Sequence, residues 1–440
     1  MNINTATALD PRRVQRRTVL ILSAAQLLSG IGNGASLSVG SLLAVQLSGS
    51  NAWAGAVTTV MTLATAVAAM PLAGLAERRG RRAGLATGVL SGMAGAILVI
   101  AATVTGLFVL LLAGAALLGL ATAANLQARF AAVDLAEPDK RGRSLAVVVW
   151  AVTAGAVAGP NLIRPGALVG EAMGLPGIAG PFIFSAAGLG LAALLLLVGL
   201  RPDPLLHALE LRGEEARPPG RQRGVLKRGL AAARSSPSAR LALLAVVTAH
   251  AAMAAVMSMT PLHLQLLMEG PPAAGQVHAH ETGTDVFVLI GFTISLHIAG
   301  MYALSPVMGW LTDRAGRLPT LMLGHGLILA AAITAGLGAG RPGLVTTGLV
   351  LLGLGWSAAT IAGSTLLAES VATGDRVLVQ GVSDTLMSGA GALGAGISGL
   401  ILSWAGYTGL NAGAAALAAA VLVATALALR GGANQASAAG

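Results

Sequence analysis

Methionine and histidine side chains recur at helical spacing in two neighbouring apolar stretches of the chain. Met253 and Met257 are four residues apart, and so are His297 and Met301 in the next stretch. Residues four apart lie on one face of an α-helix, so each stretch would present a pair of donor atoms. Thioether sulfur and neutral imidazole are soft donors that suit Cu(I) and suit magnesium, calcium or sodium poorly. Because the chain has no cysteine, such a site would hold its ion weakly enough to release it.

Both pairs would lie at a similar depth if the two stretches are helices. Counted from outer ends near residues 268 and 285, they lie roughly 11 to 16 residues in, or about 16 to 24 Å. The four side chains could then face one another. The alternative is helix packing, because methionine commonly fills irregular apolar gaps. The residues alone leave both interpretations open.

Four other histidines could form an access route for an ion bound at these pairs. His250 lies one turn before Met253 on the same helical face, and His263 lies near the end of that stretch. His278 and His280 fall in the loop that follows, where a histidine pair could capture an ion or be incidental.

Two charged residues, Arg129 and Asp384, lie inside apolar stretches. A charge there costs about 2.5–3.5 kcal/mol on insertion scales. Each could be neutralised by a structural partner, or could carry proton coupling or gating. Asp134 and Glu369 lie nearer to the ends of such stretches, and we expect them to be solvated or paired with neighbouring basic loops.

These side chains require a membrane-embedded scaffold. Of 440 residues, 55% are hydrophobic and only 10% are charged, whereas a soluble domain has about 25% charged residues. A helix needs roughly 20 apolar residues to cross a bilayer, so the chain has room for about twelve spans. We predict an all-α membrane protein with spans over 18–46, 52–76, 83–104, 106–134, 144–168, 178–201, 239–268, 285–312, 319–340, 342–370, 377–404 and 408–430.

A long polar segment divides the predicted spans into two halves. It predicts an N-terminal six-helix bundle over 1–201, a cytoplasmic linker over 202–238 with one short surface helix, and a C-terminal six-helix bundle over 239–440. Lysine and arginine concentrate before the first span, in the linker and in alternate connections, which places both termini in the cytoplasm. The net charge of +10 is then explained by topology and by contact with anionic lipids of the bilayer.

Several classes of function are disfavoured by the sequence. A nucleic-acid partner would need clustered basic residues beside exposed aromatic side chains, and only 3% of the residues are aromatic. No phosphate loop, nucleophile triad or catalytic carboxylate pair is visible in the sequence. We therefore expect no enzyme activity, no cofactor and no nucleic-acid partner.

The two halves contain related loops. The sequence after the second predicted span reads AGLAERRGRR, and after the eighth it reads GWLTDRAGR. An acid that closes one helix, a glycine turn and basic residues that open the next could form a latch of charged groups. A plain tight turn is the alternative for a single copy. The matching residues are Glu77, Arg78, Gly80 and Arg81 in the first copy and Asp313, Arg314, Gly316 and Arg317 in the second.

This repeat resembles the loop signature of the major facilitator superfamily, Gly-x-Leu-x-Asp-Arg-x-Gly-Arg. The second copy matches in full from Gly309 to Arg317, whereas the first has Ala73 and Glu77 at two of the signature positions. The resemblance covers the whole chain. It implies twelve helices in two pseudo-symmetric bundles that move about a central cavity, with substrate held near the midplane.

A second motif in the fifth predicted span points to another branch of that superfamily. The sequence GAVAGP, from Gly155 to Pro160, is similar to a signature of drug/proton antiporters, but that signature continues with glycine where this chain has Asn161. The motif is equally explained by close helix packing with a proline kink.

The paired methionine and histidine motifs resemble those of CcoA-like copper importers, a branch of the same superfamily. The surrounding sequences SMTPLHLQ and SLHIAGMYALSPVMGWLTDRAGR are also similar to that branch. The resemblance implies that Met253, Met257, His297 and Met301 bind copper, and that copper is imported for cytochrome oxidase assembly. The long outer loop and the absence of cysteine depart from it.

The resulting hypothesis is a secondary transporter of the bacterial inner membrane that imports copper, as Cu(I), by alternating access. We expect a monomer in the lipid bilayer, with copper as its substrate. The alternative is a proton-coupled multidrug exporter, favoured by the motif in the fifth span. A membrane-embedded sensor without transport is a third class.

Overall fold

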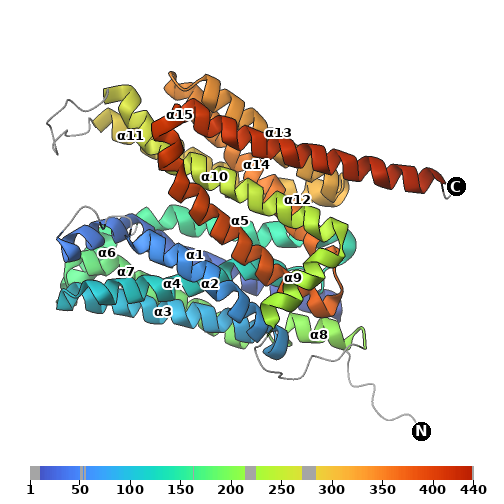
Figure 1. Cartoon of the computed structure of the whole chain (residues 1–440). Helices are drawn as coiled ribbons and strands as arrows, with labels where there is room; N and C mark the ends of the chain where they lie inside the picture. The colour runs from blue at the N-terminus through green and yellow to red at the C-terminus, as the bar shows by residue number, and fades with distance from the viewer. Residues whose placement is uncertain are drawn as a thin grey trace, which may run out of the picture. The chain divides into compact units, whose positions relative to one another are not determined.

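The computed structural model describes residues 10–49, 53, 56–161, 163–213, 224–269 and 284–438, and every regular element in these ranges is a helix. This confirms the all-α prediction. Figure 1 labels the α-helices. They are α1 (Pro11–Ser48), α2 (Ala56–Arg79), α3 (Arg81–Thr105), α4 (Phe108–Ala131), α5 (Arg141–Asn161), α6 (Ile163–Ala172), α7 (Gly180–Gly199), α8 (Pro204–Glu210), α9 (Val225–Ser235), α10 (Pro237–Glu269), α11 (Thr284–Tyr302), α12 (Ser305–Arg314), α13 (Arg317–Leu337), α14 (Pro342–Glu369) and α15 (Thr373–Ala438), with short 3-10 helices η2 (Pro138–Lys140) and η3 (Gly177–Ala179).

Nine helical segments within the described ranges are long and apolar enough to cross a bilayer. One of them lies in α15, which passes through Gly406 with a non-helical φ of 67° and ψ of −174°. Two helical stretches therefore meet at this glycine, and the bend is visible in Figure 1. It falls between the spans predicted over 377–404 and 408–430.

The span expected over 144–168 lies in α5 and α6, which are separated only by residue 162, outside the described residues. The structure differs from the sequence-based expectation in the segment 202–238. Its described residues form two short helices, α8 and α9, rather than the one expected.

The chain divides into two compact units. Unit 1 comprises Met1–Ser236 and Ala368–Thr385, and unit 2 comprises Pro237–Leu367 and Leu386–Gly440. The first turns of α15 therefore belong to unit 1, although they follow α14 in the sequence.

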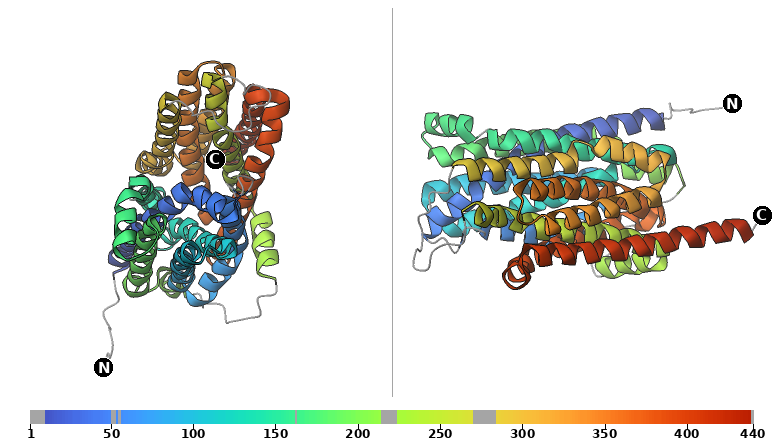
Figure 2. Two further views of the ribbon diagram at one scale, coloured as in Figure 1. Left: turned by 90° about the vertical axis from the view of Figure 1, so that its left-hand side faces the viewer. Right: turned by 90° about the horizontal axis from the view of Figure 1, so that it is seen from above.

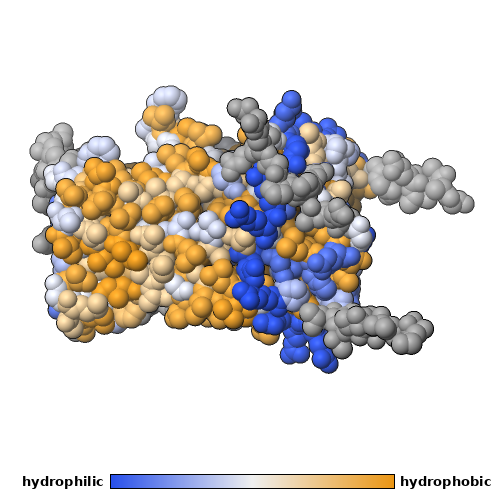
Figure 3. Space-filling model, turned by 90° about the horizontal axis from the view of Figure 1, so that it is seen from below, coloured by the Kyte–Doolittle hydropathy of each residue, from blue (hydrophilic) through white to orange (hydrophobic). Residues whose placement is uncertain are grey.

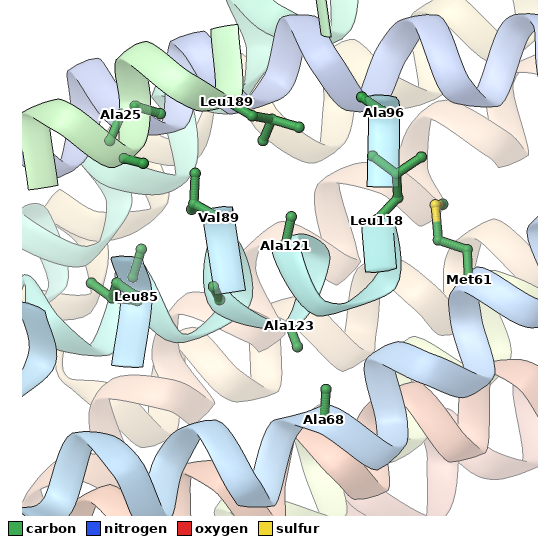
Figure 4. Close-up of a cluster of buried hydrophobic side chains, with 14 of the residues drawn as sticks. Ala25, Met61, Ala68, Leu85, Val89, Ala96, Leu118, Ala121, Ala123 and Leu189 are labelled. Atoms are coloured by element: carbon green, nitrogen blue, oxygen red, sulfur yellow. The ribbon is translucent and has the colours of Figure 1, made fainter. Parts of the chain in front are cut away.

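Unit 1 is a bundle of closely approaching helices. Its long helices run side by side, as the blue to green ribbons in both views of Figure 2 show. Gly95 of α3 permits the approach of α4, since a Cβ at this position would lie 2.6 Å from the carbonyl oxygen of Gly114. Figure 4 shows part of the buried apolar cluster of unit 1, with side chains from α3 (Val89), α4 (Ala121) and α7 (Leu189).

Unit 2 contains a second buried apolar cluster. Helices α10, α11, α13, α14 and the last part of α15 contribute to it, including Met253, Leu321 and Trp356. Hydroxyl groups also join its helices: Thr293 Oγ1 of α11 lies 2.8 Å from Thr346 Oγ1 of α14. The unit thus combines apolar contacts with neutral polar ones.

Large apolar side chains also cover much of the surface. Val67 and Val109 are 74% and 75% exposed. Figure 3 shows one face on which apolar residues predominate and hydrophilic residues gather in a band toward one end. A large exposed apolar surface of this kind marks a membrane-facing protein.

Candidate functional site

His297 is the buried donor around which the candidate site in unit 2 is built. Its side chain lies on α11 and is fully buried, and Nδ1 is 2.7 Å from the carbonyl oxygen of Leu349 on α14. A carbonyl only accepts, so Nδ1 donates, and Nε2 of a neutral ring carries the lone pair. Nε2 is buried and has no hydrogen-bond partner among the described residues. This arrangement, with one ring nitrogen fixed by a carbonyl and the other available, is typical of a metal-ligating histidine.

Two glycines allow α11 and α14 to approach closely at this position. A Cβ on Gly353 would lie 2.4 Å from the carbonyl oxygen of His297 and 3.2 Å from its Nδ1. A Cβ on Gly300 would lie 3.0 Å from the carbonyl oxygen of Val350. The backbone of α14 therefore comes near enough for the Leu349 carbonyl to fix the imidazole.

The three methionines of the predicted site lie in one apolar cluster. Met253 and Met301 are buried in the cluster of unit 2, and Met257 packs against it while partly exposed. Leu349, which holds His297, belongs to the same cluster. In the described part of the chain no three histidine, cysteine or carboxylate side chains are grouped to hold a metal. The candidate site therefore consists of three thioethers and the imidazole of His297.

The other histidines have different surroundings. His250 Nδ1 accepts a hydrogen bond of 3.0 Å from Trp356 Nε1, which occupies one of its two ring nitrogens. His263 Nε2 is 2.8 Å from the carbonyl oxygen of Ala339, so it donates, and the ring stacks on Tyr407 with centroids 4.0 Å apart. His278 and His280 lie outside the described residues.

An aromatic group beside the methionines was missed by the sequence reasoning. Trp356 of α14 makes an edge contact with Tyr302 of α11, with ring centroids 5.7 Å apart, and donates to His250 of α10. The rarity of aromatic residues, with 2 tyrosines and 5 tryptophans in the whole chain, was the signal that could have drawn attention to them.

Arg129 and Asp384 form a buried ion pair in unit 1. Arg129 Nη2 of α4 lies 2.6 Å from Asp384 Oδ1 at the start of α15, and both side chains are at least 96% buried. The guanidinium also lies 4.7 Å from the ring centroid of Phe130. Asp384 Oδ2 has no hydrogen-bond partner among the described residues. The two charged residues singled out by the sequence are therefore each other's partner.

The first copy of the loop motif is enclosed by other segments of unit 1. Arg81 is 1% exposed and donates from Nε and Nη2 to the carboxylate of Asp134, at 2.8 and 3.1 Å. Its Nη2 also donates to Gln380 Oε1 at 2.5 Å. Glu77 accepts two hydrogen bonds, of 2.7 and 3.0 Å, from Nη2 of Arg228 on α9.

Asp203, rather than the acid of the motif, caps the helix that follows the loop. Its carboxylate accepts from the backbone N–H groups of Arg81 and Arg82 at the start of α3, at 3.1 and 2.8 Å. A carboxylate is favourable at a helix N-terminus because the N–H groups there lack intrahelical partners. The latch expected from the repeat therefore includes residues of the linker as well as those of the motif.

The other acids expected near basic loops are paired with arginine. Asp134 binds Arg81, as described above, and Glu369 Oε1 accepts a hydrogen bond of 3.0 Å from Arg141 at the start of α5. In the second loop copy, Arg317 Nη1 donates to the carbonyl oxygen of Thr312 at 3.2 Å. The guanidinium of Arg314 lies 5.2 Å from the ring centroid of Trp310.

Gly155, at the start of the motif in α5, makes a close helix contact. A Cβ on Gly30 of α1 would lie 3.0 Å from the Cα of Gly155. This contact accords with the interpretation of the motif as a site of helix packing.

Comparisons with known proteins agree with this architecture. The chain is 34% identical over 406 residues to the uncharacterized MFS-type transporter YddS of Bacillus subtilis, covering 92% of this chain and 89% of that protein. It is 28% identical over 397 residues to the riboflavin transporter RfnT of Brucella anthropi, covering 90% and 92% of the two chains.

A solved structure shows the same fold. The human organic anion transporter MFSD10 (TETRAN) matches with a TM-score of 0.71 at 16% identity, covering 93% of this chain and 99% of that one. The family model for the Major Facilitator Superfamily matches residues 22–277 and 271–438. The chain thus belongs to the major facilitator superfamily of multi-pass membrane transporters, and it is not an enzyme.

Proposed function

We propose that this secondary transporter imports copper, as Cu(I), across the bacterial cytoplasmic membrane. The observation that carries the proposal is the buried Nε2 of His297, which has no hydrogen-bond partner among the described residues while Nδ1 is held by the Leu349 carbonyl. A buried polar atom without a partner costs about 1–3 kcal/mol. An incoming soft cation would supply that partner.

The methionines of unit 2 would complete the binding of the ion. Met253, Met257 and Met301 belong to or contact the apolar cluster that includes Leu349. Neutral thioethers and a neutral imidazole suit Cu(I) and impose no fixed negative charge that would retain it. A transporter that works by alternating access needs such a reversible site near the middle of the bilayer. Copper import would then supply cytochrome oxidase assembly, as the family resemblance implies.

Conservative substitutions can separate a ligand from a packing residue. Met253→Leu and Met301→Leu keep the side-chain volume nearly unchanged, at a stability cost below about 1.5 kcal/mol, but remove the sulfur. We expect each variant to lower the accumulation of radioactive copper by cells at least about tenfold. Substitutions around a metal site typically lower metal affinity or activity by about 10- to 100-fold. His297→Ala should have at least the same effect.

Met308→Leu is the matched control, because Met308 is also buried in unit 2 but lies outside the proposed set. Copper accumulation should stay unchanged in this variant, with equal amounts of protein in the membrane. Normal accumulation in Met253→Leu, Met301→Leu and His297→Ala would refute copper transport at this site.

A flavin is the second candidate substrate, because one relative is named a riboflavin transporter at 28% identity over most of both chains. Tyr302, Trp356 and His250 form an aromatic group, in which Trp356 is buried, and a flavin ring could stack on it in a state of the transport cycle that opens this cluster. On this hypothesis Trp356→Leu abolishes the uptake of labelled riboflavin, and Met253→Leu leaves it intact. If instead Met253→Leu abolishes the uptake of copper and Trp356→Leu leaves copper uptake intact, the first proposal is favoured.

The pair of Arg129 and Asp384 is our candidate for coupling or gating. Its charges are buried, and one carboxylate oxygen is without a partner in the described part of the chain. Asp384→Asn should therefore abolish accumulation driven by a proton gradient while leaving exchange at equilibrium intact. A proton-coupled multidrug exporter would instead show altered resistance to lipophilic cations in this variant, with no change in copper.

We further propose that both termini lie in the cytoplasm, following the distribution of lysine and arginine, and that the chain is a monomer, as the family resemblance implies. Cysteine residues introduced near either end should react with a membrane-impermeant reagent only after the cells are opened. The chain has no native cysteine, so the labelling would be free of background from the protein itself.

A further inference from the structure

A groove of about 400 Å³ lies at one end of unit 1, beside the start of α1 and the start of α5. Its rim carries four cations, Arg12, Arg16, Lys140 and Arg143, and one acid, Glu137. The volume is within the range that small ligands occupy in proteins. Neither the proposed metal site nor the ion pair of Arg129 and Asp384 makes use of this groove.

Only part of the positive charge is neutralised within the groove. Glu137 is bound by Arg12 at 2.8 Å and by Lys140. The hydrogen bond from Lys140 holds the pKa of Glu137 below its usual value, so this carboxyl stays ionised at neutral pH. The side chain of Arg16 is exposed and makes no hydrogen bond or ion pair with another described residue. The excess of cations over acids at the rim calls for an anionic ligand.

The wall of the groove is apolar and continues onto the outer surface of the helices. Val19 and Leu135 line it, together with Leu20 and Val147, which are 62% and 38% exposed. Leu20 follows the basic residues of α1 by one turn, and Val147 follows Arg143 of α5 by one turn. Both helices thus place cations at the rim and an apolar side chain one turn further along. This order matches an amphiphile with an anionic head and a hydrocarbon tail.

We propose that this groove is a binding site for one anionic phospholipid of the cytoplasmic leaflet. The phosphate contacts Arg16 and Arg143, and an acyl chain lies along Leu20 and Val147. The lysine and arginine distribution predicts that this end of the bundle faces the cytoplasm, where anionic lipids attract basic residues beside the membrane. Free inorganic phosphate would leave the apolar wall unused, and a neutral lipid would leave the excess cations unused.

Binding of defined lipids to the purified full chain tests the proposal. We would count bound lipids by native mass spectrometry, comparing phosphatidylglycerol with phosphatidylcholine of the same acyl chains. The wild type should retain one phosphatidylglycerol in preference to phosphatidylcholine. Because a hydrogen bond to a charged group is worth roughly a factor of ten in affinity, Arg16→Gln should weaken retention about tenfold. The double variant Arg16→Gln with Arg143→Gln removes both phosphate contacts and should weaken it further.

Arg17→Gln is the matched control, since Arg17 is an exposed cation on the same helix, next to Arg16, and does not line the groove. It should retain the lipid as the wild type does. Equal loss in both variants would show non-specific surface attraction and overturn the proposal.

Two further outcomes would also overturn it. One is equal retention of the two lipids by the wild type, and the other is displacement of phosphatidylglycerol by millimolar inorganic phosphate, which would indicate a site for soluble anions. Monodisperse elution of each variant in size-exclusion chromatography, with wild-type helix content, verifies folding.

Discussion

The two copies of the loop motif share a backbone and differ in their surroundings. Gly80 has φ 87° and ψ 167°, and Gly316 has φ 98° and ψ 164°. Each glycine directly precedes a helix, α3 in unit 1 and α13 in unit 2. This conformation is nearly restricted to glycine. The agreement between the two copies shows that the repeat recognised in the sequence is also a repeat of local structure.

The side chains around the two glycines are not equivalent. Arg81 is buried against Asp134 and Gln380, whereas Arg317 is partly exposed and donates to a carbonyl of its own loop. A Cβ on Gly80 would lie 2.3 Å from Asp203 Oδ2, but on Gly316 the nearest atom would be Pro319 Cδ at 3.6 Å. The motif therefore determines the turn, while residues outside the motif determine how strongly the turn is held.

The largest difference in stability between the two copies is expected when their arginines, Arg81 and Arg317, are replaced. Arg81→Ala leaves the carboxylate of Asp134 buried without its cation, and breaking a buried pair in this way costs about 3–5 kcal/mol. Arg317 is only partly buried, so solvent replaces part of the interactions that Arg317→Ala removes, and the cost should be about 1 kcal/mol or less. Thermal unfolding in detergent should show this order. Equal destabilisation of the two variants would mean that the enclosure of the first copy has no energetic consequence.

Replacement of the two glycines should give a smaller difference in the free energy of unfolding. Gly80→Ala and Gly316→Ala both place a side chain in a backbone conformation that costs about 1–3 kcal/mol. Gly80→Ala must also displace the carboxylate of Asp203, which caps α3. We expect the lower unfolding temperature for Gly80→Ala. The double variant Asp203→Ala with Gly80→Ala sharpens the comparison. Measured relative to Asp203→Ala alone, the destabilisation by Gly80→Ala should approach that of Gly316→Ala, because no carboxylate remains to be displaced.

The smallest effect on stability is expected when the contact between the first copy of the motif and α9 is broken. Arg228 is 44% exposed while Glu77 is 6% exposed, so solvent screens the pair, and Arg228→Gln should cost about 1 kcal/mol or less. Lys227→Gln, at an adjacent exposed position, is the control and should be neutral. Proteolysis of the linker is a sensitive measurement here. Cleavage near α9 should become faster in Arg228→Gln alone.

Much of the scaffold could be predicted because its signals are local. Apolar stretches of about 20 residues predict membrane helices, and the glycine turn was visible as a repeat around Gly80 and Gly316. The partners of Arg129 could not be predicted in the same way, since Asp384 lies 255 residues further along the chain. The cap of α3 by Asp203 was equally hidden, because 122 residues separate it from Arg81.

The candidate metal site also combines features that are visible in the sequence with contacts between residues that are distant in the sequence. The spacing of Met253, Met257, His297 and Met301 follows from helix periodicity and could be recognised directly. Which nitrogen of His297 is available depends on the carbonyl of Leu349, which is 52 residues away. The neighbouring aromatic contact between Trp356 and Tyr302 likewise joins two helices.

The sequence by itself determined the helical membrane class, the repeated loop and the donor types of the candidate site in unit 2, because periodicity, composition and turn chemistry act over a few residues. Only the tertiary structure decided that Arg129 neutralises Asp384, that Asp203 caps α3 and that Nδ1 of His297 is occupied. Those outcomes depend on which distant groups meet in a medium without water. There, a buried charge or polar atom costs free energy unless it finds a partner elsewhere in the protein.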